Sequence, residues 1–199
     1  ACLLGYYEIF NFLFENVDYY KAKLKIYDDM IISSCLGGND KILQKLLNEY
    51  PCKKCSKKKY QSFINYSIEK GNISCLKCLL SNSKKFFPRI SESFIQPSLE
   101  YASNFEFIDI IVFLVKHGGN YNDLSMQNAP LINALTSDSE STACFYLDRL
   151  PKIPDDIIIQ YFTRIFSTFY SFQIVSILLQ YMNKTLFDMK ELLSQLAIQ

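Results

Sequence analysis

Apolar positions recur along this chain with a period of about 33 residues, which is typical of stacked helical repeats. The marker is a leucine that returns at nearly equal intervals, at Leu13, Leu46, Leu79, Leu114, Leu147 and Leu178. At the first four of these, apolar residues stand three and four positions earlier and another follows directly, which places them on one face of an α-helix. The pattern therefore predicts a series of stacked helical units.

A second apolar run precedes several of these helices and ends at a small residue. The small residues are Ala1, Ser34, Ser67 and Ala102, each four positions before a glycine or its equivalent. We interpret each unit as a short inner helix, a tight turn and a longer outer helix. The small side chain would let the two helices approach closely.

These residues resemble the ankyrin repeat. The best match is the fourth unit, with Leu99, Ala102, Asp109-Ile110-Ile111, Leu114-Val115 and the closing stretch His117 to Asn122. The fifth unit opens on Pro130-Leu-Ile-Asn-Ala134, as the family pattern does. Most units lack the opening Thr-Pro, and the closing Gly-Ala-Asp is clear only once. The resemblance therefore implies irregular loops and few β-hairpin fingers.

The expected fold is an all-α, ankyrin-like helical-repeat solenoid of about six helix-turn-helix units, forming a single domain over residues 1–199. The units are expected at 1–16 (partial), 28–50, 60–82, 96–122, 129–150 and 156–181, with a C-terminal capping helix at 185–199. The first unit lacks most of its inner helix, so we expect the sequence to be a fragment of a longer protein.

Composition and cysteine usage favour a protein of the cytoplasm. The chain is 49% hydrophobic and 21% charged, yet no apolar run approaches the roughly 18 residues that would cross a bilayer. Seven cysteines are an odd number. Of the three sequons, at Asn65, Asn72 and Asn183, the first two fall inside helices that must pack. Both features favour a reducing compartment.

Two Cys-x-x-Cys pairs, Cys52/Cys55 and Cys75/Cys78, leave two interpretations open. Four thiolates at this spacing could hold zinc. However, Cys75 and Cys78 occupy repeat positions that are apolar in other units, where cysteine is a small buried hydrophobe. The sequence favours free thiols, and we expect no metal and no cofactor.

Charge is balanced overall at +1 but concentrated locally, since residues 50–90 contain ten basic residues and one acidic residue. The densest part is Lys53, Lys54, Lys57, Lys58 and Lys59. This segment is either a docking patch for an acidic partner or a solvated loop between units. No RNA-binding motif accompanies the nearby aromatic residues, so we do not expect nucleic-acid binding.

No catalytic constellation can be assembled from the sequence, so we expect no enzyme. The single histidine, His117, follows an outer helix, where an imidazole caps the last carbonyls. The pairs Asp28-Asp29 and Asp155-Asp156 precede apolar runs, and we interpret both as helix starts.

The ankyrin resemblance implies a non-catalytic protein-protein interaction module that binds its partner through a concave face. The turn positions that would line this face are Leu36, Glu69, Lys70, Asn104, Phe105, Thr136 and Ser137. At further turn positions, Leu3, Leu4 and Phe169 are also apolar; these residues either anchor a partner or are buried under loops.

The abundance of Lys, Asn, Ile, Tyr and Phe makes the chain similar to ankyrin proteins of large DNA viruses or intracellular bacteria, which implies a host protein as partner. The alternative is the substrate-docking arm of a larger enzyme or a ubiquitin-ligase adaptor.

Overall fold

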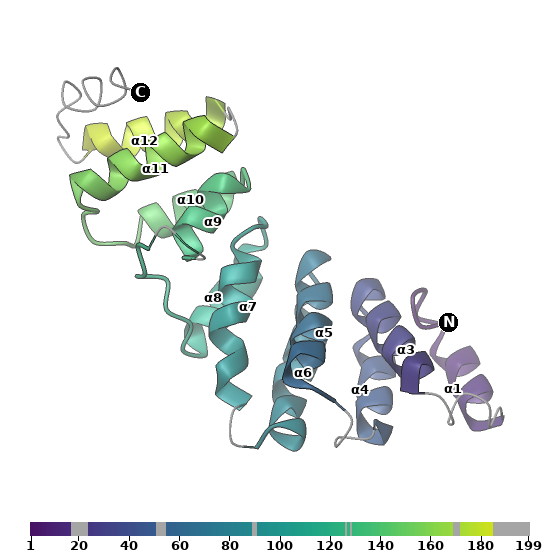
Figure 1. Cartoon of the computed structure of the whole chain (residues 1–199). Helices are drawn as coiled ribbons and strands as arrows, with labels where there is room; N and C mark the ends of the chain where they lie inside the picture. Colours follow the sequence, from purple (N-terminus) through teal and green to yellow (C-terminus); the bar gives the residue numbers. More distant parts are fainter. Residues whose placement is uncertain are drawn as a thin grey trace. The chain divides into compact units, whose positions relative to one another are not determined.

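The structure is a computed structural model that describes residues 1–16, 24–50, 55–88, 91–125, 127, 129–168 and 172–184 (Figure 1). Over these residues it contains eleven α-helices and one 3-10 helix, and no strand. None of the described helices is long and apolar enough to cross a membrane. The chain divides into two compact units, Ala1–Ser98 and Leu99–Gln199. The expectation of one domain over 1–199 stays a prediction.

The N-terminal unit consists of helix pairs. Its elements are α1 (Tyr7–Asn16), α3 (Leu24–Gly37), α4 (Asp40–Glu49), α5 (Lys57–Glu69), α6 (Ile73–Phe86) and η2 (Ser91–Phe94). Helix α3 packs against α4, and α5 packs against α6, each pair being joined by a short turn. The pairs also lie side by side, because α3 contacts α5, and α4 contacts both α6 and α1. These contacts match the alternation of inner and outer helices expected from the sequence.

The C-terminal unit is also built of helices that pack against their neighbours. Helix α7 (Ile95–Ala102) contains the boundary between the units, and it is followed by α8 (Ile108–Lys116), α9 (Pro130–Thr136), α10 (Glu140–Leu147), α11 (Asp155–Thr168) and α12 (Phe172–Lys184). Helix α9 packs against α10 and α11, while α10 also contacts α8 and α12. Pro130 opens α9, where the missing amide proton and the fixed φ are both compatible with a helix start.

The turns between paired helices in the N-terminal unit depend on glycine. Gly38 and Gly71 have φ angles of +73° and +67°, in the left-handed region that side chains disfavour. The amide that follows Gly38 donates to the carbonyl of Ser34 at 2.9 Å, and the amide that follows Gly71 donates to the carbonyl of Ser67 at 2.8 Å. Both serines are fully buried, at the positions where the sequence predicted that a small side chain lets two helices approach closely.

The recurring leucines form the core, with one exception. The buried members are Leu46, Leu79, Leu114, Leu147 and Leu178. Leu13 has the same surrounding pattern but is 39% exposed. Burial of that position requires a neighbouring helix, and no described helix pairs with α1 as α3 pairs with α4.

Several predicted boundaries can be compared with the helices. Asp155 and Asp156 open α11, as expected. The interpretation of Asp28-Asp29 as a helix start was wrong, because α3 begins at Leu24 and the two carboxylates lie in its second turn. The capping helix expected at 185–199 lies outside the described residues.

Candidate functional site

Helix α1 has two apolar faces, and only one of them is covered. Phe10 and Phe14 are buried, and the Phe14 ring meets Tyr27 of α3 edge-on, with 5.9 Å between the ring centroids. On the other side Ile9 is 53% exposed and Phe12 is 67% exposed. A helix that is apolar on both sides has a second surface that water solvates poorly.

Exposed apolar side chains also occur in the turn before α1. Of the seven large apolar side chains that are exposed among the described residues, six lie between residues 3 and 13. We name them the α1 apolar face: Leu3, Leu4, Tyr6, Ile9, Phe12 and Leu13. The seventh, Phe172, lies in the other unit. Exposed apolar groups that are concentrated in one part of a protein mark interaction sites more often than groups scattered singly do.

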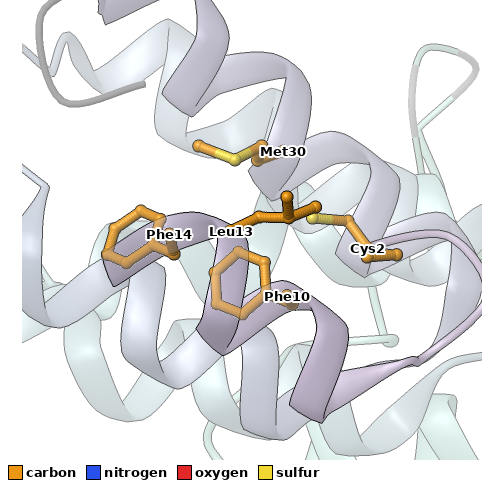
Figure 2. A pocket seen from close by; sticks show the side chains of 6 residues that line it. Cys2, Phe10, Leu13, Phe14 and Met30 are labelled. Carbon is orange, nitrogen blue, oxygen red and sulfur yellow. The ribbon is translucent and has the colours of Figure 1, made fainter. Parts of the chain in front are cut away.

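A pocket of about 190 Å³ adjoins the α1 apolar face (Figure 2). We name it the α1–α3 pocket; its lining residues are Ala1, Cys2, Phe10, Leu13, Phe14 and Met30. Figure 2 shows Met30 of α3 on one side and the two phenyl rings of α1 on the other. A cavity of about 150 Å³ can hold a benzene ring. The α1–α3 pocket therefore has room for one aromatic or branched aliphatic side chain.

The charged side chains of helix α1 itself are acidic, and one of them pairs with a lysine of α4. Helix α1 contains Glu8 and Glu15 and no basic residue. These positions are seven apart and therefore lie on the same side of the helix. Glu15 forms a 2.9 Å ion pair with Lys45 of α4, yet 66% of its side chain stays exposed. The hydrogen bond that Lys45 Nζ donates to Glu15 is the main cause that raises the pKa of Lys45.

The predicted turn residues of the N-terminal unit lie at the ends of α3 and α5. Leu36 is half-buried near the end of α3, and its carbonyl accepts a hydrogen bond of 3.2 Å from the Asn72 side chain. Glu69 is the last residue of α5, and Lys70 follows it, exposed. A Cβ at Gly37 would clash with the Leu3 carbonyl, so successive turns lie in direct contact.

Two asparagines join one turn to the next, and the sequence analysis missed them. Asn39 Nδ2 donates to the carbonyl of Cys2 at 2.6 Å, and Asn72 Nδ2 donates to the carbonyl of Cys35 at 2.6 Å. Neither side chain caps the helix that it precedes. The signal was present in the sequence, since both residues follow a turn glycine and stand one repeat apart.

The predicted turn residues of the C-terminal unit are partly tied to one another. Ser137 Oγ donates to Asn104 Oδ1 at 2.7 Å, and Thr136 Oγ1 donates back to the Ile132 carbonyl of its own helix at 2.8 Å. Phe105 is half-buried, and its ring contacts Tyr101 at 5.5 Å between centroids. The structure thus brings residues 104 and 137 together and covers part of Phe105.

The basic segment is helical where it is described. Lys57, Lys58 and Lys59 form the first turn of α5, whereas the sequence analysis considered a loop; Lys53 and Lys54 lie outside the described residues. Ser56 caps this helix by accepting from the Lys59 amide at 3.2 Å.

Of these lysines, Lys59 has a partner within the chain. Its Nζ lies 2.7 Å from Asp28 Oδ2, and Asp28 also accepts from the Tyr50 hydroxyl at 2.5 Å. Burial and this hydrogen bond raise the pKa of Tyr50. Lys57 and Lys58 are exposed and form the described part of the basic patch.

The structure places Cys75, Cys78 and His117, which the sequence raised as candidates for metal binding or helix capping. Cys75 is fully buried, and burial raises its pKa to about 12 and that of Cys78 to about 11. Within the described ranges no group of three or more His, Cys, Asp or Glu side chains could hold a metal ion, and Cys52 falls outside them. His117 follows α8, with Nδ1 2.8 Å from the Phe113 carbonyl, where the sequence placed a helix cap.

Comparisons with protein-family models, curated proteins and solved structures found no match to this chain. Any functional conclusion therefore depends on the residues themselves. Among the described residues, the α1 apolar face and the α1–α3 pocket form the largest concentration of exposed apolar groups.

Proposed function

We propose that this chain is a non-catalytic, ankyrin-like repeat protein that binds a partner protein through the N-terminal unit. The observation that supports this most directly is the α1 apolar face. Apolar surface gains about 25 cal/mol per Å² when it leaves water. Six large apolar side chains on one turn and one helix therefore favour association with a complementary surface.

The ankyrin-like part of the proposal is supported by the repeated helix pairs. Inner helices α3 and α5 contact each other, as do outer helices α4 and α6. The turn after α3 and the turn after α5 each contain a glycine with positive φ, Gly38 and Gly71, and each follows a buried serine, Ser34 and Ser67. Repeats of this kind offer extended binding surfaces, because each unit contacts only its neighbours and leaves its turns accessible.

The predicted turn residues would extend the contact surface beyond α1. Leu36 adjoins the turn of Leu3 and Leu4 through the contact between Gly37 and the Leu3 carbonyl. Lys57 and Lys58 are exposed in the same unit and would attract an acidic part of a partner, which mainly accelerates encounter. The odd number of cysteines supports a cytoplasmic setting, with a host protein as one candidate partner.

The proposal can be tested by affinity capture from cytosolic extract with three forms of the chain. The test variant is Ile9→Ser with Phe12→Ser, which makes the α1 apolar face polar. The control is Phe172→Ser, which removes an even more exposed phenyl ring, 83% accessible, from the other unit. Circular dichroism verifies that all three forms are equally helical.

We expect at least one protein to be retained by the unmodified chain and by the control but lost by the double variant. Its affinity would then be measured by calorimetry with purified components. If all three forms retain the same proteins, the α1 apolar face is not a binding surface and the proposal is wrong.

A further inference from the structure

A second pocket lies in the C-terminal unit, between α10 and α12, which pack against each other. Its volume is about 260 Å³. We name it the α10–α12 pocket; its lining residues are Cys144, Leu147, Asp148, Ile177, Gln180 and Tyr181. The repeat register shows what occupies the same position elsewhere in the chain.

Buried positions align these two helices with α4 and α6. Helix α4 buries residues 42, 43, 46 and 47, and α10 buries residues 142, 143, 146 and 147. Residues 75, 79 and 83 of α6 are buried, and residues 174, 178 and 182 of α12 are buried at the same spacing. The contact between α4 and α6 is therefore the counterpart of the contact between α10 and α12.

In the N-terminal unit, side chains close this position. The carboxamide of Gln44 donates to Asn48 Oδ1 at 3.0 Å and accepts from Asn82 Nδ2 at 3.0 Å. The Cys78 thiol also donates to Gln44 Oε1, at 3.3 Å. The corresponding residues, in the same order, all line the α10–α12 pocket: Cys144, Asp148, Tyr181 and Ile177.

The α10–α12 pocket is open because Cys144 stands where α4 has Gln44. Cysteine lacks the carboxamide through which Gln44 reaches its three partners. Ile177 has no polar hydrogen to donate, and the ionised carboxylate of Asp148 can only accept. The pocket is therefore the counterpart of a network built on a glutamine that the C-terminal unit lacks.

The carboxylate of Asp148 sets the chemistry of the pocket. Asp148 is exposed and caps the C-terminus of α10, where the helix carbonyls add negative potential. None of the ion pairs between described residues includes it. The guanidinium of the neighbouring Arg149 is held by Phe145, 4.0 Å from the ring centroid, with Nη1 3.1 Å from the carbonyl oxygen. Since Leu147 and Ile177 add apolar lining, the pocket joins an aliphatic surface to a negative charge.

The contact between α1 and α4 shows how this chain holds a cation at the same register. Glu15 of α1 has the register position of Asp148. Glu15 forms a 2.9 Å ion pair with Lys45 of α4, and the Lys45 ammonium also lies 5.7 Å from the centroid of the Phe14 ring. In the α10–α12 pocket the position of Lys45 belongs to Ile177, which has no charge. A cation that pairs with Asp148 in this pocket therefore comes from another molecule.

We propose that the α10–α12 pocket binds one basic side chain, lysine or arginine, of a partner protein. The aliphatic part of that side chain lies against Leu147 and Ile177, and its charged end pairs with Asp148 beside the carboxamide of Gln180. A cavity of about 150 Å³ holds benzene, so a pocket of about 260 Å³ has room for either side chain. The site lies in the C-terminal unit, so it adds to the proposed function and does not depend on the α1 apolar face.

The test is an NMR titration of the whole chain with labelled methyl groups, in which the signals of Leu147 and Ile177 report binding. The probes are three acetylated and amidated tripeptides, with glycine on both sides of lysine, arginine or norleucine. Norleucine has the aliphatic stem of lysine without its ammonium group. A fourth probe, n-butylammonium, has the charged side chain without a peptide backbone.

We expect the lysine or the arginine peptide to shift both signals and to bind at least about threefold more tightly than the norleucine peptide, as an exposed ion pair would allow. Asp148→Asn, which removes the charge and keeps the size of the side chain, should weaken binding by a similar factor. The matched control is Asp138→Asn, because Asp138 is an exposed aspartate of the same unit outside the pocket; it should leave binding unchanged. Cys144→Gln, which introduces the residue of α4, should abolish the shifts.

Circular dichroism verifies that each variant is as helical as the unmodified chain; if Cys144→Gln does not fold, Asp148→Asn and the norleucine peptide still decide the matter. The inference is overturned if no peptide shifts the two signals, if the norleucine peptide binds as tightly as the basic peptides, or if Asp138→Asn weakens binding as much as Asp148→Asn. Binding that a folded Cys144→Gln variant leaves unchanged would also overturn it. Binding of n-butylammonium without binding of either basic peptide would assign the pocket to a free amine instead of a partner's side chain. None of these results bears on the α1 apolar face, so the proposed function stands or fails by its own test.

Discussion

Asn72 offers the sharpest test of how the repeats are held together. Its Nδ2 donates to the carbonyls of Cys35 and Leu36, at 2.6 Å and 3.2 Å. Both acceptors belong to the end of α3, in the preceding helix pair, and neither bond caps α6. Asn72→Ala should therefore weaken the contact between successive pairs without changing the helix that it precedes.

The magnitude follows from these two bonds. A hydrogen bond contributes about 0.5–1.5 kcal/mol net, and a part-buried carbonyl left without its donor adds to the loss. The longer bond of 3.2 Å contributes less than the shorter one. A Cβ at Gly38 would approach Asn72 Oδ1 to 2.8 Å, so little room exists for water to replace the amide. We expect Asn72→Ala to lower the free energy of unfolding by about 1–3 kcal/mol.

The assay is urea unfolding, monitored by circular dichroism at 222 nm. The dependence of the free energy of unfolding on urea concentration should have the same slope in each variant. The matched control is Asn48→Ala, because Asn48 is exposed and its side chain accepts a hydrogen bond of 3.0 Å from Gln44 of the same helix. That change should stay within about 0.5 kcal/mol of the unmodified chain. If Asn72→Ala costs no more than Asn48→Ala, the side chain does not stabilise the stacking of the pairs.

Three further predictions concern the core, the ion pair and the thiols. In urea unfolding, Leu79→Ala should lower the free energy of unfolding by about 2–5 kcal/mol, because Leu79 is fully buried. Leu13→Ala, at the exposed counterpart, should lower it by less than about 1 kcal/mol. Equal losses for the two variants would contradict the difference in burial between these leucines. Lys59→Met should lower the free energy of unfolding by about 0.5–1 kcal/mol, because its ion-pair partner Asp28 is only 17% exposed. Lys58→Met should have no measurable effect on it. Burial raises the pKa of Cys75 from 9.0 to about 12. The free energy by which the neutral, buried thiol stabilises the fold is therefore complete below pH 9 and is lost as the pH rises towards 12. Melting temperatures across this range should fall more steeply for the unmodified chain than for Cys75→Ala.

Local pattern predicted the helices and the turns well. The repeat period located outer helices α4, α6 and α8, and the buried leucines Leu46 and Leu79 follow directly from it. The glycine turns at Gly38 and Gly71 were also readable, since each follows a small residue by four positions. These features depend on residues close together in the chain, where hydrophobic spacing and backbone preference act.

Similar local patterns nevertheless had different outcomes in the tertiary structure. Two pairs of aspartates precede apolar runs, yet Asp155 opens a helix and Asp28 lies inside one. Asp28 is placed by Tyr50 and Lys59, which approach it from 22 and 31 residues away. No reading of the residues around Asp28 could have supplied these partners.

The spacing of apolar residues along the chain predicted that the protein is built of helices whose apolar positions recur about every 33 residues. Which of those sides are covered is a property of the packed helices: Leu46 is buried, while Leu13, which has apolar residues at the same spacings in sequence, is 39% exposed and lines the α1–α3 pocket. The physical reason is that periodicity is a property of a single helix, whereas burial requires a second helix to pack against it.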